Sequence, residues 1–477
     1  MWLTQYWRWP LVNRMGRIQQ IHFVGIGGVG MSGIAEVLLN QGYRVTGSDV
    51  KSSPATERLR QLDAAIFIGH DAQHIDGADV LVVSSAIDTQ NPEVACALEA
   101  RIPVIPRAQM LAELMRFKQG IAISGTHGKT TTTSLASSVL AEAGLDPTFI
   151  IGGKLNQADT NAKLGDSQYM VAEADESDAS FLVLKPMISI VTNIDADHMS
   201  TYGGDFERLK STFVQFLQNL PFYGTVIANA DDPVVTEILP RVGRTALTFG
   251  IDQAADYRAV DVRADGLMTH FKVHRPDGSV LDVTLSMPGR HNVLNALAVI
   301  ALADHLDVED AALLHALAAF QGVGRRFQLA GTLHRDGAEI PVIDDYGHHP
   351  KELEVTFDAV RAAYPGRRLV SVFQPHRFTR TQDLFDDFVS VLTTADALVL
   401  LPVFAAGEAP IVGAESKDLA KLIRQVGRCQ PVVEKDFDHV IARLDQLLQP
   451  DDVVLVQGAG SVGRLPAEIM AYFGGGR

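Results

Sequence analysis

The stretch "IHFVGIGGVGMSGIAEVLLNQGYRVTGSD", residues 21–49, decides the fold of the first part of the chain. It reads as an apolar strand, a glycine-rich turn, a helix and a second strand, which is the unit of an open parallel sheet. Gly25, Gly27 and Gly30 have the G-x-G-x-x-G spacing, and Asp49 ends the second strand. Because this spacing lets backbone amides approach a diphosphate, it predicts a nucleotide site.

Apolar runs of strand length alternate with helical patterns along the chain, which predicts an α/β protein with parallel sheets. In the opening stretch, Ile34, Val37 and Leu38 share one helical face before Gly42 ends the helix. The runs form three sets, at 21–27, 43–49, 64–70, 79–86 and 102–107, at 120–124, 168–175, 187–195 and 224–231, and at 340–350, 368–376, 396–404 and 452–460.

A β-rich insert and a helix over 291–306 separate the second set from the third. The Asp277-Gly278 pair marks a turn within that insert. A chain of 477 residues exceeds one core, so we expect three domains, at 1–117, 118–322 and 323–477.

The composition limits the function and the compartment. A net charge of -16 argues against a nucleic-acid coat or binding to an anionic membrane surface. Cys96 and Cys429 lie far apart and have no C-x-x-C partner, so a disulfide framework or a cysteine metal site is not expected. We expect a cytoplasmic protein without a membrane span. The first seventeen residues hold all three tryptophans but lack a signal-peptide core, and we assign them no function.

The strongest single motif is "GTHGKTTTT", residues 125–133, after the strand "GIAIS". Gly125 and Gly128 allow the backbone to curl around a phosphate, Lys129 supplies positive charge, and Thr130 offers a hydroxyl to Mg²⁺. Ile123 stands where the strict P-loop pattern has its first glycine, so Gly125 takes over the turn. The alternative is a glycine turn before an ordinary helix with a solvated lysine.

Acidic side chains follow two later strands, where a magnesium–ATP site needs carboxylates. The stretch "EADESDASF" carries Glu173, Asp175, Glu176 and Asp178, and "VTNIDADHM" carries Asp195, Asp197 and His198. Because parallel strands end at one edge of a sheet, we expect these side chains to meet the phosphates. Each segment alone is equally compatible with a solvated acidic loop.

The chain resembles the Mur ligase family over essentially its whole sequence after residue 17. The resemblance lies in "HFVGIGGVGMSGIAEVLLNQGY", "VVSSAI", "GTHGKTTTT", "EADESDASFL", "NLPFYG", "PGRHNVLNALA", "GVGRRF", "DDYGHHP", "FQPHRFTRT" and "AAGEAPI". It implies an N-terminal Rossmann-like UDP-binding domain, a central P-loop ATPase domain and a C-terminal Rossmann-like domain that binds an amino acid. Seven positions known across the family fall on Lys129, Glu173, His198, Asn292, Asn295, Arg326 and Asp345.

The resemblance implies that the first glycine turn holds UDP rather than NAD. The candidate UDP-sugar contacts are Gly25, Gly27, Gly28, Gly30, Asp49, His70, Ser84, Ser85 and Arg107. Taken alone, each polar residue among them is equally compatible with a loop residue whose hydrogen bonds are made within the protein. The same spacing recurs in "QGAGSVG", but only fourteen residues follow it, so we expect a terminal turn there.

The resemblance also implies an ATP site with ATP and Mg²⁺ or Mn²⁺ as cofactors, and neither NAD nor flavin. The candidate ATP contacts are Gly125, Thr126, His127, Gly128, Lys129, Thr130, Thr131, His291, Asn292, Asn295, Arg326 and Asp345. The candidate metal ligands are Thr130, Glu173 and His198, and the candidate catalytic residues are Lys129, Glu173, His198, Arg326 and Asp345. Some family members carry a carbamylated lysine fifteen residues after the histidine, but this chain has Phe213 there, so no such modification is expected.

The amino-acid site is expected in the C-terminal domain, after the strands that precede "DDYGHHP" and "FQPHRFTR". Its candidates for binding L-alanine are Tyr346, His348, His376, Arg377 and Arg380. The arginines have an alternative role as ion-pair partners of Asp383 and Asp386 on the following helix. His349, beside Pro350, is expected in a turn.

Within the family, the motifs favour the reaction that joins L-alanine to the lactyl carboxylate of UDP-N-acetylmuramate through an acyl phosphate, in peptidoglycan synthesis. Its partners are these small molecules and ATP, and the chain is a monomer or a homodimer. Three alternatives stay open: a nicotinamide oxidoreductase, a P-loop switch or motor ATPase, and the ligase that recycles a murein tripeptide onto the same UDP-sugar.

Overall fold

The computed structural model describes residues 15–84, 86–156, 160–335 and 337–474. The chain divides into two compact units. The first consists of residues 1–154, 159–248 and 301–308, and the second of residues 155–158, 249–300 and 309–477. The Trp-rich segment up to residue 14 lies outside the described residues.

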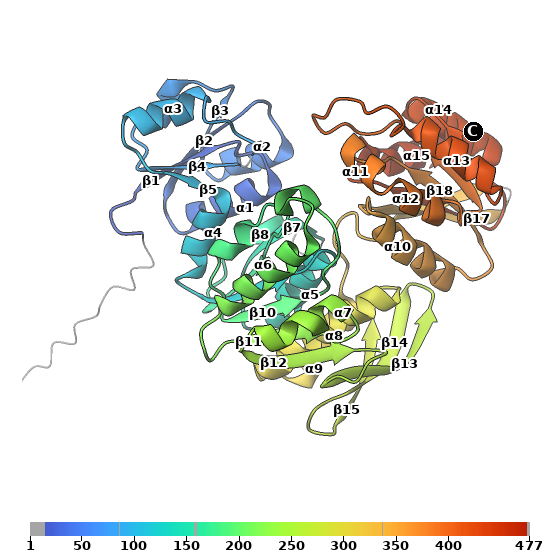
Figure 1. The fold of residues 1–477 in the computed structure, drawn as a ribbon, viewed down its shortest axis with the longest axis horizontal. Coiled ribbons are helices and arrows are strands. Elements are labelled where there is room, and N and C mark those ends of the chain that lie inside the picture. Colours follow the sequence, from blue (N-terminus) through green and yellow to red (C-terminus); the bar gives the residue numbers. More distant parts are fainter. Residues whose placement is uncertain (1–14, 85, 157–159, 336, 475–477) are drawn as a thin grey trace, which may run out of the picture. The chain divides into compact units, whose positions relative to one another are not determined.

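The first unit begins with a five-stranded sheet in the order β3-β2-β1-β4-β5 (Figure 1). Every neighbouring pair in it is parallel. The opening stretch forms β1 (Gln20–Val24), α1 (Val29–Asn40) and β2 (Arg44–Asp49), so the predicted strand–turn–helix–strand unit is confirmed. The β1 strand is buried along its whole length, as expected for the centre of a sheet covered on both faces.

A larger sheet follows in the first unit, where the strands run in the order β12-β11-β10-β6-β9-β7-β8. At its centre, β6 (Gln119–Ser124) pairs in parallel with β10 (Ile188–Val191) on one side and with β9 (Tyr169–Glu173) on the other. The carboxyl ends of β9, β6 and β10 therefore lie side by side. This is the edge at which open α/β sheets bind their ligands.

Close packing joins the two sheets of the first unit. A side chain at Gly33 on α1 would meet Ala162 at 3.2 Å, so glycine lets α1 lie close to β8 (Thr160–Lys163). The Asn161 amide donates to the carbonyl of Val29 at 2.8 Å. One core cluster includes apolar residues of both sheets, such as Ile21 of β1 and Met170 of β9, which explains why the two sheets form one unit.

The second unit contains the predicted β-rich insert as the antiparallel strands β13, β14 and β15. Its large sheet has the order β16-β17-β21-β18-β19-β20. The β16 strand is an antiparallel edge, while β17, β21, β18, β19 and β20 pair in parallel. Two separate apolar clusters supply the cores of this sheet, one with Phe357 and Phe388 and the other with Val342 and Val456. The three predicted α/β sheets are confirmed.

The remaining elements have the following bounds. In the first unit they are α2 (Pro54–Gln61), β3 (Ala65–Ile68), η1 (Ala72–Ile75), β4 (Val80–Val83), α3 (Pro92–Glu99), β5 (Val104–Pro106), α4 (Arg107–Met115), α5 (Lys129–Glu142), β7 (Thr148–Leu155), η2 (Ser180–Val183), η3 (Met199–Tyr202), α6 (Phe206–Gln218), β11 (Thr225–Asn229), α7 (Pro233–Ile238), η4 (Leu239–Arg241) and β12 (Thr245–Gly250).

From β13 onward the bounds are β13 (Tyr257–Asp265), β14 (Met268–His274), β15 (Val280–Leu285), α8 (Arg290–His305), α9 (Asp310–Ala319), β16 (Gln328–Arg335), β17 (Ala338–Asp345), α10 (Pro350–Ala363), β18 (Arg368–Phe373), α11 (Phe378–Asp383), α12 (Phe385–Leu392), β19 (Ala397–Leu400), α13 (Ser416–Val426), β20 (Val432–Val433), α14 (Phe437–Leu447), β21 (Asp452–Gln457), η5 (Ser461–Arg464) and α15 (Leu465–Gly474).

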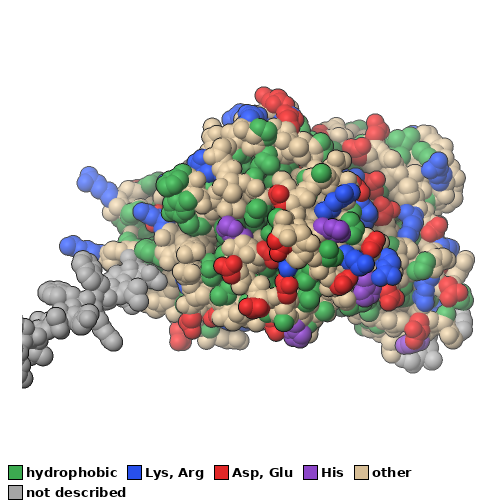
Figure 2. All heavy atoms as spheres, turned by 90° about the horizontal axis from the view of Figure 1, so that it is seen from below, with side chains coloured by type: hydrophobic (Ala, Val, Ile, Leu, Met, Phe, Trp, Pro, Cys, Tyr) green, Lys and Arg blue, Asp and Glu red, His purple; other side chains and the backbone are tan. Residues whose placement is uncertain are grey.

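Surface charge is mixed in sign. Figure 2 shows acidic and basic side chains interspersed over the face that it displays, rather than gathered into one field of a single sign. No helix among the described residues is both long enough and apolar enough to cross a membrane.

Candidate active site

The P-loop connects β6 to α5 and has the backbone that its glycines predict. Gly125 and Gly128 adopt φ values of +126° and +85°, which L-residues with side chains rarely adopt. A side chain at Gly125 would also lie 2.1 Å from the Thr192 hydroxyl. Lys129 is the first residue of α5, so the loop presents the N-terminus of a fourteen-residue helix. This end of a helix favours anions.

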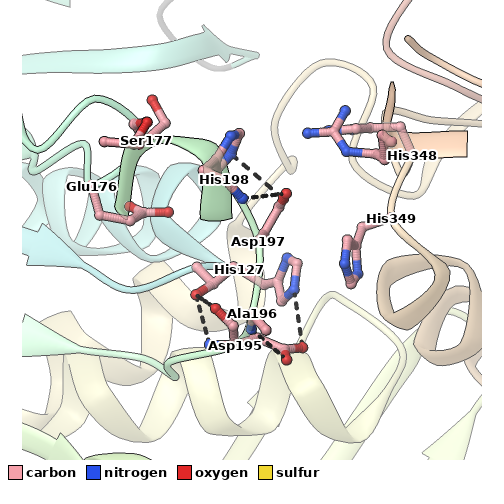
Figure 3. A network of polar contacts seen from close by, with 12 residues as sticks. His127, Glu176, Ser177, Asp195, Ala196, Asp197, His198, His348 and His349 are labelled. Atoms are coloured by element: carbon pink, nitrogen blue, oxygen red, sulfur yellow. Dashed lines mark hydrogen bonds and ion pairs between the residues drawn. The ribbon is translucent and has the colours of Figure 1, made fainter. Parts of the chain in front are cut away.

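The segment that follows β10 holds this loop in place. The amide of His127 donates to the Asn193 side chain at 2.8 Å, and the amide of Thr126 donates to the Asn193 carbonyl at 3.0 Å. Asp195 returns a contact from its own amide to the Thr126 hydroxyl at 2.8 Å. Its carboxylate lies 3.6 Å from the His127 imidazole, a contact drawn as a dashed line in Figure 3. The loop is therefore preorganised by side chains at the end of the neighbouring strand.

Lys129 forms a buried ion pair with Glu176. Its ammonium donates to both carboxylate oxygens, at 2.9 and 2.8 Å, and to the carbonyl of Gly125 at 2.6 Å. Burial opposes the lysine charge, but Glu176 and Asp175 outweigh it and raise the pKa of Lys129. Burial also raises the pKa of Glu176, to about 6, although Lys129 opposes that rise. The positive charge of Lys129 and the negative charge of Glu176 thus compensate each other inside the site.

The predicted metal ligands lie in the same unit, around this pair. Glu173 ends β9 and accepts the Gly152 amide at 2.6 Å through one carboxylate oxygen. Thr130 lies in the first turn of α5 beside Thr131, and both are buried. His198 adopts a left-handed φ of 55° before η3 and lies 3.5 Å from the Asp197 carboxylate. Glu173 ends β9 and Thr130 follows the neighbouring strand β6, and the metal-binding role of all three side chains stays a prediction.

The glycine turn of the first sheet gathers three of its predicted partners. Gly27 donates its amide to the Asp49 carboxylate at 2.8 Å. A side chain at Gly30 would lie 2.7 Å from the guanidinium of Arg107, and one at Gly25 would meet Ser84 at 3.3 Å. Gly28 caps α1 with extended backbone.

His70 and Ser85 differ from that group. The His70 imidazole contacts Ser48 at 3.1 Å and the buried carboxylate of Glu93 at 3.3 Å. Ser85 lies outside the described residues.

In the second unit, two of the predicted ATP contacts, Asn292 and Asn295, contact each other. Asn292 donates its amide to the Pro288 carbonyl at 2.8 Å, and Asn295 donates to the Asn292 side chain at 3.2 Å. These contacts hold both side chains at the start of α8, and their role in binding ATP stays a prediction. Burial lowers the pKa of the neighbouring His291 to about 4, although Asp345 opposes that fall.

Asp345, the last residue of β17, holds the segment that precedes β16. Its carboxylate accepts the amide of Phe327 at 3.0 Å and that of Gly347 at 2.9 Å. Arg326 lies over the Tyr346 ring, with its guanidinium carbon 5.0 Å from the ring centroid, and 3.9 Å from a carboxylate oxygen of Glu352.

The candidate amino-acid residues form a chain of rings beyond β17 and β18. Tyr346, His348 and His376 follow one another with ring centroids 5.5 and 5.7 Å apart, and His376 stacks on Phe404 at 5.5 Å. Burial, assisted by nearby positive charge, lowers the pKa of His376 to about 4. A neutral ring beside His348, Arg377 and Arg380 is suited to orient a polar ligand.

Two arginines flank these rings. Arg380 approaches the Nδ1 of His376 at 3.5 Å, and Arg377 opens α11 with a left-handed φ of 70°. Within the described ranges, Arg377 forms no ion pair with Asp383 or Asp386. His349 caps α10, as its predicted turn position implies.

The second glycine run is a terminal turn, as predicted. After β21, a side chain at Gly463 would lie 2.3 Å from the guanidinium of Arg325, which also donates to the Gly458 carbonyl at 2.5 Å. The glycines make room for a protein side chain at this place.

Sequence reasoning missed two acidic residues that organise these groups. Glu176 was one of several acids in one loop, and only the path of the turn decides that it meets Lys129. Glu93 was unmarked, yet it is fully buried among three histidines. The signal available for Glu93 was its place directly after Asn91-Pro92, where a helix start was readable but its buried partners were not.

Comparison with known proteins covers most of the chain. Three family models match in succession: "Mur ligase family, catalytic domain" over residues 20–119, "Mur ligase middle domain" over residues 123–303, and "Mur ligase, glutamate ligase domain" over residues 325–460.

Solved structures give a similar result. The chain is 30% identical to the UDP-N-acetylmuramate-alanine ligase MurC of Thermotoga maritima, with a TM-score of 0.80, over 95% of this chain and 99% of that one. It is 25% identical to a murein peptide ligase of Psychrobacter arcticus, with a TM-score of 0.69, over 96% and 99%. A ligase from Neisseria meningitides that acts on L-alanyl-gamma-D-glutamyl-meso-diaminopimelate is 30% identical, with a TM-score of 0.58, over 64% and 98%.

Proposed function

The chain belongs to the Mur ligase family of ATP-dependent ligases for peptidoglycan precursors, and from this premise we propose that it joins L-alanine to the lactyl carboxylate of UDP-N-acetylmuramate. One observation carries the proposal: a P-loop lysine, Lys129, paired with the buried Glu176, stands in a chain that also has a separate glycine turn at residues 25–30. A ligase that activates a nucleotide-linked carboxylate with ATP uses both.

The chemistry explains the need for ATP. An oxygen of the lactyl carboxylate attacks the γ-phosphorus of ATP, and ADP leaves with the electron pair of the broken P–O bond. The neutral amine of L-alanine then attacks the acyl carbon, loses a proton, and phosphate leaves as the amide forms. Lys129 balances the phosphate charge in the first step, and Arg326 is the second cation assigned to it.

A divalent cation fits the donors of the first unit. The Glu173 carboxylate, the Thr130 hydroxyl and the His198 imidazole are oxygen and nitrogen donors that Mg²⁺ or Mn²⁺ accepts. Glu173 uses one of its oxygens for the Gly152 amide, and its carboxylate belongs to the strand edge beside the P-loop. The metal supplies positive charge against phosphate oxygens.

The ring cluster of the second unit is assigned to L-alanine. Arg380 and Arg377 are assigned to its carboxylate, and Tyr346, His348 and His376 to its amine and methyl group. Because its pKa is about 4, His376 is neutral at pH 7. Its Nδ1 faces Arg380, which only donates, so Nε2 carries the proton and acts as a hydrogen-bond donor to the ligand. We also propose domain boundaries near 117 and 322, a cytoplasmic location, and a monomer or homodimer.

The recycling of a murein tripeptide is the second candidate, because two of the similar structures are ligases of that kind. An isotope experiment tests the alanine reaction. The enzyme is given ATP, L-alanine and UDP-N-acetylmuramate whose lactyl carboxylate carries ¹⁸O. We expect a product heavier than the substrate by one alanyl residue, and one ¹⁸O in the released phosphate. Product without ¹⁸O in the phosphate contradicts the acyl-phosphate route.

A further inference from the structure

We propose that Glu93 is a positioning residue for the UDP-sugar, because it fixes His70 in the tautomer that protonates Nδ1 and leaves Nε2 as a hydrogen-bond acceptor for the nucleotide. The proposal rests on the proposed function only in naming UDP as the nucleotide. Its first observation is a cluster that no step of the reaction uses.

Glu93 brings together four elements at the carboxyl edge of the first sheet. The carboxylate is fully buried and meets His22 of β1 at 3.1 Å, Ser48 of β2 at 2.6 Å, His70 at 3.3 Å and His74 of η1 at 3.1 Å. Burial favours the neutral acid, but the hydrogen bonds from His22, Ser48 and His74 outweigh it and lower the pKa of Glu93 to about 2. Glu93 is therefore an anion that only accepts.

The donors of this cluster decide where the His70 proton lies. Ser48 has one hydroxyl proton, and it donates that proton to the Glu93 carboxylate at 2.6 Å. The Nδ1 of His70 faces the same Ser48 oxygen at 3.1 Å and a Glu93 oxygen at 3.3 Å. Both partners accept at these contacts, so Nδ1 carries the proton. In the neutral ring, Nε2 then holds a lone pair.

The His70 side chain lies where a ligand of the glycine turn can reach it. It follows β3, and its side chain is 18% exposed, whereas Glu93 is 0% exposed. Among the described residues, Nε2 of His70 has no hydrogen-bond partner. The Ser48 carbonyl accepts the amides of Gly25 and Ile26 at 2.9 and 3.0 Å, so one residue links the cluster to the turn. Hence Glu93 acts on the site through Ser48 and His70.

An acceptor at this position selects a donor on the nucleotide. UDP offers two kinds, the N3–H of uracil and the ribose hydroxyls. A site whose polar group is left unpaired by an analogue rejects that analogue strongly. The base and the sugar are told apart by binding of UDP, N3-methyl-UDP, 2′-deoxy-UDP and 3′-deoxy-UDP to the full-length protein. Equal affinity for all four overturns the assignment of Nε2 as an acceptor for either kind of donor.

The protonation state is read directly by ¹⁵N spectra of histidine side chains in the full-length protein. The His70 signals are assigned from their absence in H70Q. We expect wild-type His70 as the neutral ring with the proton on Nδ1, and in E93Q a mixture of tautomers. A proton on Nε2 in wild type, whether the ring is neutral or charged, overturns the proposal, and this reading requires no folded Glu93 variant.

Binding of UDP provides the second test. We expect E93Q to raise the Kd of UDP about tenfold, to raise KM for the UDP-sugar in proportion, and to leave kcat and the KM of ATP unchanged. E99Q is the matched control, because Glu99 is an exposed residue on the same helix, α3. Wild type that does not bind UDP contradicts the proposed function. Wild type and E93Q that bind UDP equally well overturn the role of Glu93.

Discussion

At the scale of single residues, the buried pair of Lys129 and Glu176 sets the properties of the P-loop. The ammonium has two carboxylate oxygens and a loop carbonyl as partners before any phosphate arrives. Breaking a buried pair by removing one partner leaves an uncompensated charge, which costs about 3–5 kcal/mol. ATP brings anionic oxygens to the same lysine. Either ATP or Glu176 can therefore supply the negative charge that compensates the Lys129 ammonium.

This leads to a prediction for Glu176. We expect E176Q to lower the thermal midpoint of unfolding of the ATP-free protein. Adding magnesium–ATP should restore much of that midpoint in E176Q. ATP should therefore stabilise E176Q more than it stabilises wild type. Thermal unfolding with and without magnesium–ATP measures both shifts. Equal ATP-induced shifts in the two proteins would show that Glu176 does not compensate the charge of Lys129.

Lys129 itself is predicted to act on the chemical step. K129A removes the cation assigned to the transferring phosphate, so kcat for phosphate release should fall by about 100-fold or more. K163A is the matched control, because Lys163 pairs with Asp146 at 2.7 Å on the protein surface. Stopped-time phosphate assays at saturating substrates measure the change. A K129A rate within a few-fold of the K163A rate would remove Lys129 from the mechanism.

A pH dependence follows from Glu93. Its pKa is 4.5 ordinarily and about 2 in the folded protein, because hydrogen bonds outweigh burial. Because the pKa of Glu93 is lower in the folded protein than in the unfolded one, Glu93 stabilises the fold at pH values above 4.5. This contribution is lost as the pH falls from 4.5 toward 2. The gap in unfolding free energy between wild type and E93Q should shrink by up to about 3 kcal/mol over that range. Calorimetry at pH 7 and about pH 3 measures it, and a constant gap contradicts the cause given.

At the scale of elements, the glycine turn after β1 depends most on the close contact between Gly27 and the Asp49 carboxylate. A side chain at Gly27 would lie 2.8 Å from the Asp49 carboxylate, whereas the nearest atom to one at Gly28 is 3.6 Å away. Gly27 has to be small because its amide donates to that same carboxylate. The two neighbouring glycines are therefore unequal.

We expect G27A to lower the thermal midpoint of unfolding, by an amount equivalent to about 1–3 kcal/mol, because the turn and Asp49 have to move apart. G28A should unfold within about 1 °C of wild type. Differential scanning calorimetry of both variants without ligand gives the comparison. A G28A variant that is as destabilised as G27A would show that the contact with Asp49 is not the reason.

Much at this scale was predictable from sequence, and its limits have a physical cause. Strand–turn–helix patterns predicted the β1 to β2 unit, the P-loop and α8, because burial periodicity and glycine positions are local. The ion pair of Lys129 with Glu176 was not predictable, because Glu173, Asp175 and Glu176 follow the same strand and the turn decides which reaches the lysine. The cluster on Glu93 joins residues up to 71 positions apart, which no local pattern records.

At the scale of the whole molecule, the chain contains three α/β sheets and two glycine runs of identical spacing with different roles. The run beginning at Gly25 lies beside polar side chains such as Asp49, whereas the run beginning at Gly458 accommodates Arg325. Resemblance over the full length identified the family from sequence, and identity of 30% leaves the choice between L-alanine and a tripeptide to experiment.

The most direct test of this account is phosphate release by the purified protein with magnesium–ATP and UDP-N-acetylmuramate, compared with no acceptor, with L-alanine and with L-alanyl-γ-D-glutamyl-meso-diaminopimelate. We expect release that requires both the UDP-sugar and L-alanine. Release only with the tripeptide would contradict the alanine assignment, and release indifferent to every acceptor would contradict the ligase reaction itself.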